Sequence, residues 1–245
     1  MEEKTTQPEK EPSLRKKFLS YFKEFFMMFL AVFMGFIAEN IREQLSDNEK
    51  GQEYVESFVK NLQSDTAQLK ALISYSKQQV SGLDSLIKVS KNKISQPIVQ
   101  DSLFILTRKY LYNTTEFKNN DVTLSQLRNA GGFGFIKNAN VLDSIAAFES
   151  YLATTKEQYA ATTAIFERAR ERSLELLDLN SELKLTQYTA GIPVMISTDK
   201  EKVGAYFNGC WMARGALRAY TGMLQDGLKH IEGIIAYIKK EYRIK

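Results

Sequence analysis

The chain has 245 residues, of which 44% are hydrophobic and 25% charged, so it is long and apolar enough for one large or two small folded domains. The formal net charge of +4 gathers at the two ends and forms no basic stripe with interleaved aromatic residues, which excludes the usual pattern of a nucleic-acid binder. A single cysteine, Cys210, and a single histidine, His230, exclude an intramolecular disulfide and the usual zinc sites. We expect a packed thiol at Cys210, a surface or interface imidazole at His230, and no cofactor.

The first predicted element is a hydrophobic helix within KEFFMMFLAVFMGFIAENIRE, residues 23–43. Its uninterrupted apolar run, Phe25 to Ala38, spans only about 21 Å as a helix, a length typical of a signal peptide or a buried core helix. The flanking apolar residues extend it from Phe18 to Ile41, about 36 Å. A signal-peptide cleavage site needs small residues, and bulky Phe33 and Phe36 stand where they would be required. The pattern favours an uncleaved transmembrane anchor over residues 18–42.

The two faces of this anchor differ. Phenylalanines recur every three or four residues on one face, which suits lipid or a partner: Phe18, Phe22, Phe25, Phe29, Phe33 and Phe36. On the other face Ala31 and Gly35 form a small-x-x-x-small pair, followed by Ala38, and such pairs let helix backbones approach closely. The sequence therefore predicts membrane self-association through Ala31, Gly35 and Ala38.

The charges that flank the anchor predict its orientation. Six Lys or Arg residues fall within residues 4–23, against only Arg42 and Lys50 within 39–58. The positive-inside rule then places the N-terminus in the cytoplasm and the large domain on the other side of the membrane. For a bacterium this means an inner-membrane protein with a single span and a periplasmic domain.

A long amphipathic helix follows the anchor. Apolar residues repeat with a four–three spacing over nearly five heptads, which predicts a coiled-coil-like seam. The predicted seam is Val55, Val59, Leu62, Thr66, Leu69, Ile73, Ser76, Val80, Leu83 and Ile87.

The middle of the chain is more broken. Pro97 interrupts the helical pattern, Asp101 is a candidate N-cap for a shorter helix that ends near Asn113, and NTTEFKNND at 113–121 is typical of a polar loop. A short helix is expected over 123–129. The glycine-rich NAGGFGFIKNAN, residues 129–140, lacks the Gly-Lys-Ser/Thr of a phosphate loop. We expect instead a helix stop at Gly131, a turn that places Phe133, Phe135 and Ile136 in the core, and a new helix from about Asn140.

Two long helices are predicted to complete the fold. The first repeats the four–three spacing from Val141 to Leu176, with small and polar residues at its centre that favour a bundle core but are compatible with a ligand-lined interior. An extended break is expected over 180–197, and Ser197 or Asp199 caps a last helix that runs to about Tyr242. Its six glycines require close packing to offset roughly 1 kcal/mol each. They are Gly204, Gly209, Gly215, Gly222, Gly227 and Gly233, and its predicted buried face is Tyr206, Phe207, Trp211, Leu217, Tyr220, Leu224, Ile231, Ile235 and Ile238.

Three segments carry a resemblance to a family of uncharacterised bacterial single-span membrane proteins. They are LAVFMGFIAENIRE at 30–43, YVESFVKNLQSDTAQL at 54–69 and LRNAGGFGFIKNANVLDSI at 127–145. The resemblance covers most of residues 18–152. It implies the anchor and a helical domain, and no activity.

A second resemblance is to an O-glycosylation signal of bacterial periplasms, in which Asp precedes Ser or Thr and an apolar residue. The matches lie at Thr66, Ser85, Ser102 and Ser144. Because Thr66 falls on the predicted seam, the candidate acceptors are Ser85, Ser102 and Ser144. Helix capping by Asp101 and Asp143 is the alternative explanation.

The sequence as a whole predicts an all-α protein. An N-terminal transmembrane helix continues into a long helix, and an antiparallel helical bundle of coiled-coil-like hairpins follows. The expected organisation is a basic cytoplasmic tail (1–17), the anchor (18–42) and an extramembrane domain (43–245). We expect a non-enzymatic scaffold that contacts the bilayer and associates with itself or with a partner membrane protein. The alternative is a periplasmic sensory or ligand-binding bundle that acts through a partner subunit.

Overall fold

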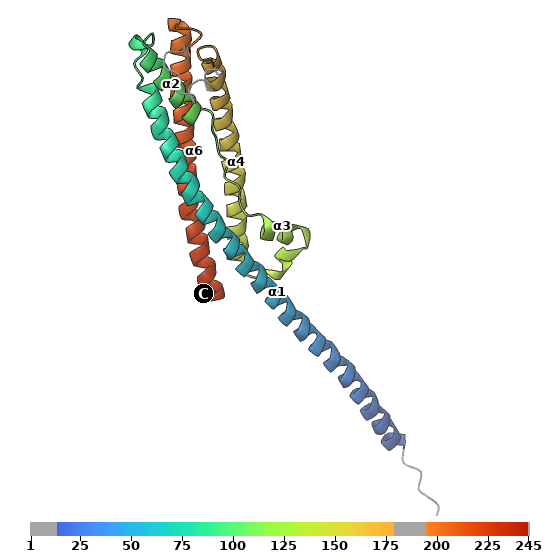
Figure 1. Ribbon diagram of the computed structural model, residues 1–245. Coiled ribbons are helices and arrows are strands. Elements are labelled where there is room, and N and C mark those ends of the chain that lie inside the picture. Colours follow the sequence, from blue (N-terminus) through green and yellow to red (C-terminus); the bar gives the residue numbers. More distant parts are fainter. Residues whose placement is uncertain (1–13, 179–194, 245) are drawn as a thin grey trace, which may run out of the picture. The chain divides into compact units, whose positions relative to one another are not determined.

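The computed structural model describes residues 14–178 and 195–244, and the chain is all-α over these ranges (Figure 1). Among the described residues the only bridge-type pairing outside helices joins Leu177 and Met195, which flank the undescribed segment. The expected break over 180–197 lies mostly outside the described residues. The chain divides into two units, Met1–Gly51 and Gln52–Lys245, and the fold class predicted from the sequence is confirmed.

Helix α1 spans Leu14–Ile87 and belongs to both units. In the first unit every side chain from Phe18 to Leu45 is exposed, including the large apolar ones. Within the described residues this is the one helix long and apolar enough to cross a membrane. Phenylalanines one turn apart stack on each other along this segment, with ring centroids 6.2 Å apart for Phe22 and Phe26 and 5.9 Å for Phe29 and Phe33.

In the second unit α1 buries a regular stripe of one residue every three or four positions: Val55, Phe58, Leu62, Asp65, Leu69, Leu72, Ser76, Gln79, Leu83 and Leu86. Half of these positions belong to the predicted seam. Val59 and Ile73 of the predicted seam are buried as well, so the buried face is wider than one stripe. Only Thr66, Val80 and Ile87 of the predicted seam lie at its edge and are partly covered. Two of the buried positions hold Asp65 and Gln79, polar residues that a simple coiled-coil seam does not explain.

Helix α1 ends ten residues before Pro97. A 3-10 turn (Lys91–Lys93) follows, and α2 spans Pro97–Tyr110 with Pro97 in its first turn. Proline is favoured there because its missing N–H would have no helical partner. The prediction that Asp101 caps this helix is wrong: Gln96 occupies the N-cap position, and Asp101 lies inside the helix.

Residues 111–121 are not helical, and we call them the strap. They lead from α2 to α3, the short helix Val122–Asn129. Gly131, at φ +66°, adopts the left-handed conformation that ends a helix, as the sequence predicts. In the turn Gly132–Phe135 and just after it, Ile136 is buried, Phe133 is partly buried, and Phe135 stacks on Tyr54 at 6.3 Å.

Helices α4 (Ala139–Leu174) and α6 (Lys200–Tyr242) complete the second unit. Asn138 caps α4 and Asp199 caps α6, each accepting two backbone N–H bonds. The prediction of Asp199 as a cap is therefore confirmed, whereas Asp143 lies inside α4 and caps nothing.

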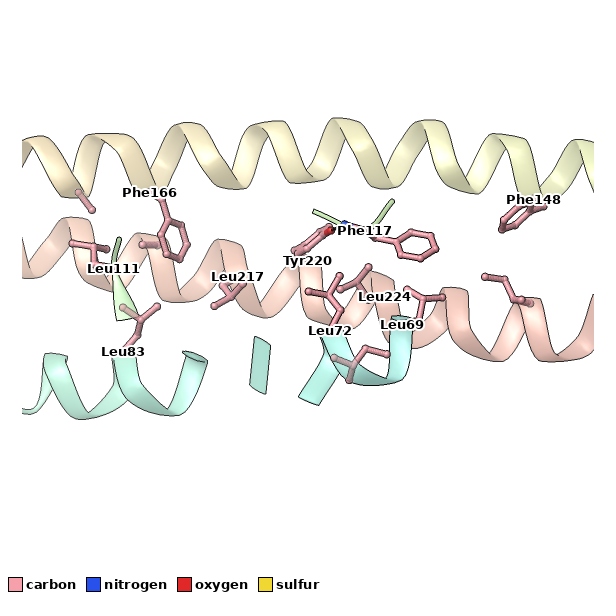
Figure 2. Close-up of a cluster of buried hydrophobic side chains, with 14 of the residues drawn as sticks. Leu69, Leu72, Leu83, Leu111, Phe117, Phe148, Phe166, Leu217, Tyr220 and Leu224 are labelled. Atoms are coloured by element: carbon pink, nitrogen blue, oxygen red, sulfur yellow. Dashed lines mark hydrogen bonds between the residues drawn. The ribbon is translucent and has the colours of Figure 1, made fainter. Parts of the chain in front are cut away.

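Charged pairs join α1 to α6. Asp84 binds Arg214 at 2.8 Å and Lys70 binds Glu232 at 2.9 Å, so the two helices run antiparallel. The side chains between the three long helices form one hydrophobic core along the bundle (Figure 2). It includes Leu69 and Leu83 of α1, Phe148 and Phe166 of α4, and Leu224 of α6.

Most glycines of α6 are not closely packed, which differs from the prediction that all six require close neighbours. Only two of the six predicted to need close packing have it: Gly209 lies against Ala169 of α4, and Gly227 lies under the ring of Tyr151. A Cβ at Gly204, Gly215, Gly222 or Gly233 would meet nothing within 4 Å. Trp211, predicted on the buried face, is 58% exposed.

Candidate functional site

The strap is held to α1 by two polar residues of the buried stripe, Gln79 and Asp65. The Gln79 amide donates to the carbonyl oxygen of Tyr110 at 2.9 Å and also to that of Asn113. Asp65 Oδ1 accepts a hydrogen bond from the backbone N–H of Asn120 at 2.7 Å. These side chains satisfy backbone groups that would otherwise be buried without partners.

The spacing of these contacts defines the course of the strap. Gln79 and Asp65 are separated by two heptads of α1, about 21 Å of helix. Asn113 and Asn120, their partners, are joined by seven residues of chain, which reach about 25 Å at full extension. The strap is therefore almost fully extended and runs antiparallel to α1, as Figure 1 shows.

Side chains of α4 and α6 bind the other side of the strap. The Tyr220 hydroxyl accepts from the backbone N–H of Phe117 at 2.9 Å, and Phe117 itself points into the core beside Tyr220 (Figure 2). Arg170 Nε donates to the Leu111 carbonyl at 2.9 Å. The segment that the sequence predicts as a polar loop is thus a structural element, with Leu111 and Phe117 buried.

Asp65 is the most unusual group of this arrangement. The residue is 0% exposed, and its second oxygen, Oδ2, has no hydrogen-bond partner among the described residues. Burial raises the pKa of Asp65 to about 6, because a charge is poorly solvated there, and the N–H bond from Asn120 lowers the pKa by less.

A second buried polar pair joins α2 to α6. Thr107 donates to the Leu103 carbonyl at 2.6 Å, so the Tyr206 hydroxyl donates to Thr107 at 2.5 Å. Cys210, one turn beyond Tyr206, is fully buried, and burial raises the pKa of its thiol to about 12. A thiol that stays protonated is a poor nucleophile, so Cys210 is the packed residue that the sequence predicts. His230 is exposed, also as expected.

The surface carries several shallow hollows. One of about 420 Å³ lies between α1 and the strap, lined by Leu72, Tyr75 and the strap residues Thr115, Glu116 and Phe117. A second, of about 500 Å³, lies between α1 and α2 and shares Tyr75. Two more follow the groove between α4 and α6: one of about 310 Å³ with Arg168 and Arg172, and one of about 540 Å³ with Tyr151, Asp226 and His230.

Ala31, Gly35 and Ala38, the predicted self-association residues, are exposed on α1 in the first unit. A Cβ at Gly35 would meet nothing within 4 Å, so the backbone is open to a partner there. This geometry is compatible with the prediction and does not test it.

The predicted glycosylation residues lie inside helices. Ser85 and Ser102 are exposed and Ser144 is partly exposed, and each hydroxyl donates to the carbonyl oxygen four residues earlier, at 3.1, 2.8 and 2.8 Å. Asp84, which precedes Ser85, is engaged by Arg214 and Arg218. Modification of these serines stays a prediction.

The structural roles of Asp65 and Gln79 were not predicted from the sequence. Their signal is visible in the sequence, because two large polar residues spaced by two heptads share one face of a helix, and that face is otherwise apolar except for Ser76. Among the described residues no cluster of three His, Cys, Asp or Glu side chains has the arrangement of a metal site. Comparisons of the chain with protein-family models, with curated proteins and with solved structures gave no match.

Proposed function

We propose that this protein is a membrane-anchored helical interaction protein, without enzymatic activity, that associates with itself through its anchor. The exposed apolar surface of α1 from Phe18 to Ile41 is the observation that carries this proposal. A buried core helix would be covered by the rest of the chain, whereas Phe25, Met27 and Phe36 are 64%, 71% and 72% exposed. Such a contiguous apolar surface needs lipid or protein to cover it.

The charges beside the anchor and its small residues support a specific orientation and a helical partner in the membrane. The excess of Lys and Arg before the anchor supports a cytoplasmic N-terminus, with the second unit in the periplasm of a bacterium. The open backbone at Gly35, one turn from Ala31, supports helix–helix contact within the bilayer. The partner is then a second copy of the chain or another membrane protein.

Crosslinking of the full chain in native membranes tests self-association. We expect a crosslinked dimer in the wild type and a loss of at least several-fold in Gly35→Ile, because a branched side chain would separate the two backbones. Phe33→Leu, on the opposite face, is the matched control and should leave the dimer unchanged. A wild-type chain that is monomeric in membranes and in detergent at every concentration would contradict the proposal.

A sensory role is the second candidate. It is favoured by one observation, the fully buried carboxyl of Asp65, which holds the strap through one oxygen and leaves the other without a partner among the described residues, because Asp is almost never fully buried without a charge partner. In this role the strap would respond to a stimulus and a partner subunit would carry the signal across the membrane.

A further inference from the structure

The buried stripe of α1 places a carboxyl group where a leucine or valine would stabilise the core best. Asp65 makes one hydrogen bond, to the backbone N–H of Asn120 at 2.7 Å, and leaves its second oxygen without a partner among the described residues. An ionised carboxylate in this position is costly, because burial removes its water and one N–H bond does not replace it.

Several charged side chains of the elements that pack against this part of α1 are paired with one another. The residues one turn away on its own helix are uncharged: Asn61, Leu62, Gln68 and Leu69. Arg128 of α3 binds Glu149 of α4 and Asp121 at the end of the strap, and Glu232 of α6 binds Lys70. The remaining charged groups of the strap are Glu116 and Lys118. Among the described residues no basic side chain forms an ion pair with Asp65, and burial and the Asn120 hydrogen bond are the causes that shift its pKa.

We propose that Asp65 is a proton-binding site that controls the attachment of the strap to α1. With the proton bound, the neutral carboxyl stays buried and its oxygen accepts from Asn120. Loss of the proton favours a state in which this end of the strap, near Asn120, leaves α1 and water reaches the carboxylate. The inference goes beyond the proposed function and does not rest on membrane anchoring.

The other contacts of the strap limit the movement to one end. Gln79 binds the carbonyls of Tyr110 and Asn113, and Tyr220 binds the N–H of Phe117. Gln79 carries no titratable group. The pKa of Tyr220 is raised to about 12 by burial, so its hydroxyl keeps its proton at physiological pH.

Amide hydrogen exchange of the full chain in detergent micelles tests this proposal. After correction for the intrinsic pH dependence of exchange, the wild-type amide of Asn120 should lose roughly 10- to 100-fold protection between about pH 4.5 and about pH 8. The pH dependence should be absent in Asp65→Asn, whose amide mimics the neutral carboxyl and keeps an oxygen acceptor. Asp84→Asn, a carboxylate bound by arginines at the surface, should keep the wild-type profile.

Two results would overturn the proposal. One is a wild-type Asn120 amide whose corrected protection does not change with pH. The other is Asp65→Asn retaining the wild-type pH profile. The first result needs no variant, so the proposal stays testable even if a substitution prevents folding.

Discussion

Asp65 Oδ1 accepts the backbone N–H of Asn120 at 2.7 Å, fifty-five residues further along the chain. This bond explains why a carboxyl group occupies a buried position of a heptad stripe. The extended strap presents backbone groups to α1 that need partners, and Asp65 and Gln79 supply them.

The stability of the protein should depend on the protonation of Asp65. Its pKa is about 6 in the folded chain, above the ordinary value of 3.8, so the folded state binds the proton more tightly than the unfolded state. Stability is then lost as the pH rises from about 4 to about 6. Asp65→Asn should raise the free energy of unfolding by up to about 2–3 kcal/mol near pH 8 and change it little near pH 4. Denaturant unfolding at the two pH values measures this, and equal effects at both would contradict it.

The contribution of Asp84 to stability should depend on pH in the opposite direction to that of Asp65. Hydrogen bonding to Arg214, with Arg218 nearby, holds the pKa of Asp84 below its usual range. Its contribution is therefore present at neutral pH and lost as the pH falls below the ordinary carboxyl value. Because the cluster lies near the surface, Asp84→Asn should cost no more than about 1 kcal/mol near pH 7. The difference in unfolding free energy between wild type and Asp84→Asn should therefore shrink on acidification. A difference that grows as the pH falls would contradict this assignment.

Removing the Tyr220 hydroxyl should weaken the attachment of the strap to α6 and lower the stability of the protein. Tyr220→Phe leaves the backbone N–H of Phe117 buried without its acceptor, which costs about 1–3 kcal/mol. Tyr159→Phe is the matched control, because its hydroxyl makes only a long contact of 3.3 Å with Thr114. Thermal unfolding of both variants compares them. Equal effects would mean that the Phe117 contact does not stabilise the strap.

Substitution by alanine should change the free energy of unfolding in opposite directions at two glycines of α6. Gly222 faces open space, so Gly222→Ala should stabilise the helix by about 0.5–1 kcal/mol. Gly227 lies beneath Tyr151, and a Cβ there would overlap the ring, so Gly227→Ala should destabilise the protein by about 1–3 kcal/mol. Unfolding of the two variants in the same detergent measures the difference. A destabilising Gly222→Ala would instead indicate that another helix packs on this face.

Periodicity was sufficient to predict the helices and much of their burial. The last helix ends at Tyr242 and the stop at Gly131 is left-handed, as expected from the pattern. Most of the predicted α1 seam is buried, and the prediction differs at Thr66 and Val80, where the preceding polar residues Asp65 and Gln79 are the buried ones and carry no hydrophobic signal.

The strap could not be predicted in the same way. NTTEFKNND is polar in composition, and its burial follows from partners that are distant in sequence, such as Tyr220 and Arg170. Trp211 was placed in the core because aromatic residues are commonly buried, yet it lies on the exposed side of α6, with the guanidinium of Arg214 5.6 Å from its ring. The burial of these residues cannot be predicted from the local sequence pattern, because it depends on which faces of α6 are covered by α1 and α4.

The central claim is that α1 anchors the chain in a membrane with the second unit outside the cytoplasm. The most direct test tags the C-terminus of the full chain, expresses it in a bacterium with a periplasm, and treats spheroplasts with protease. We predict a full-length chain in the membrane fraction with a protease-sensitive tag. A tag that stays protected in intact spheroplasts, but is digested after lysis, would contradict the orientation. A soluble chain, shortened or intact, would contradict the anchor itself.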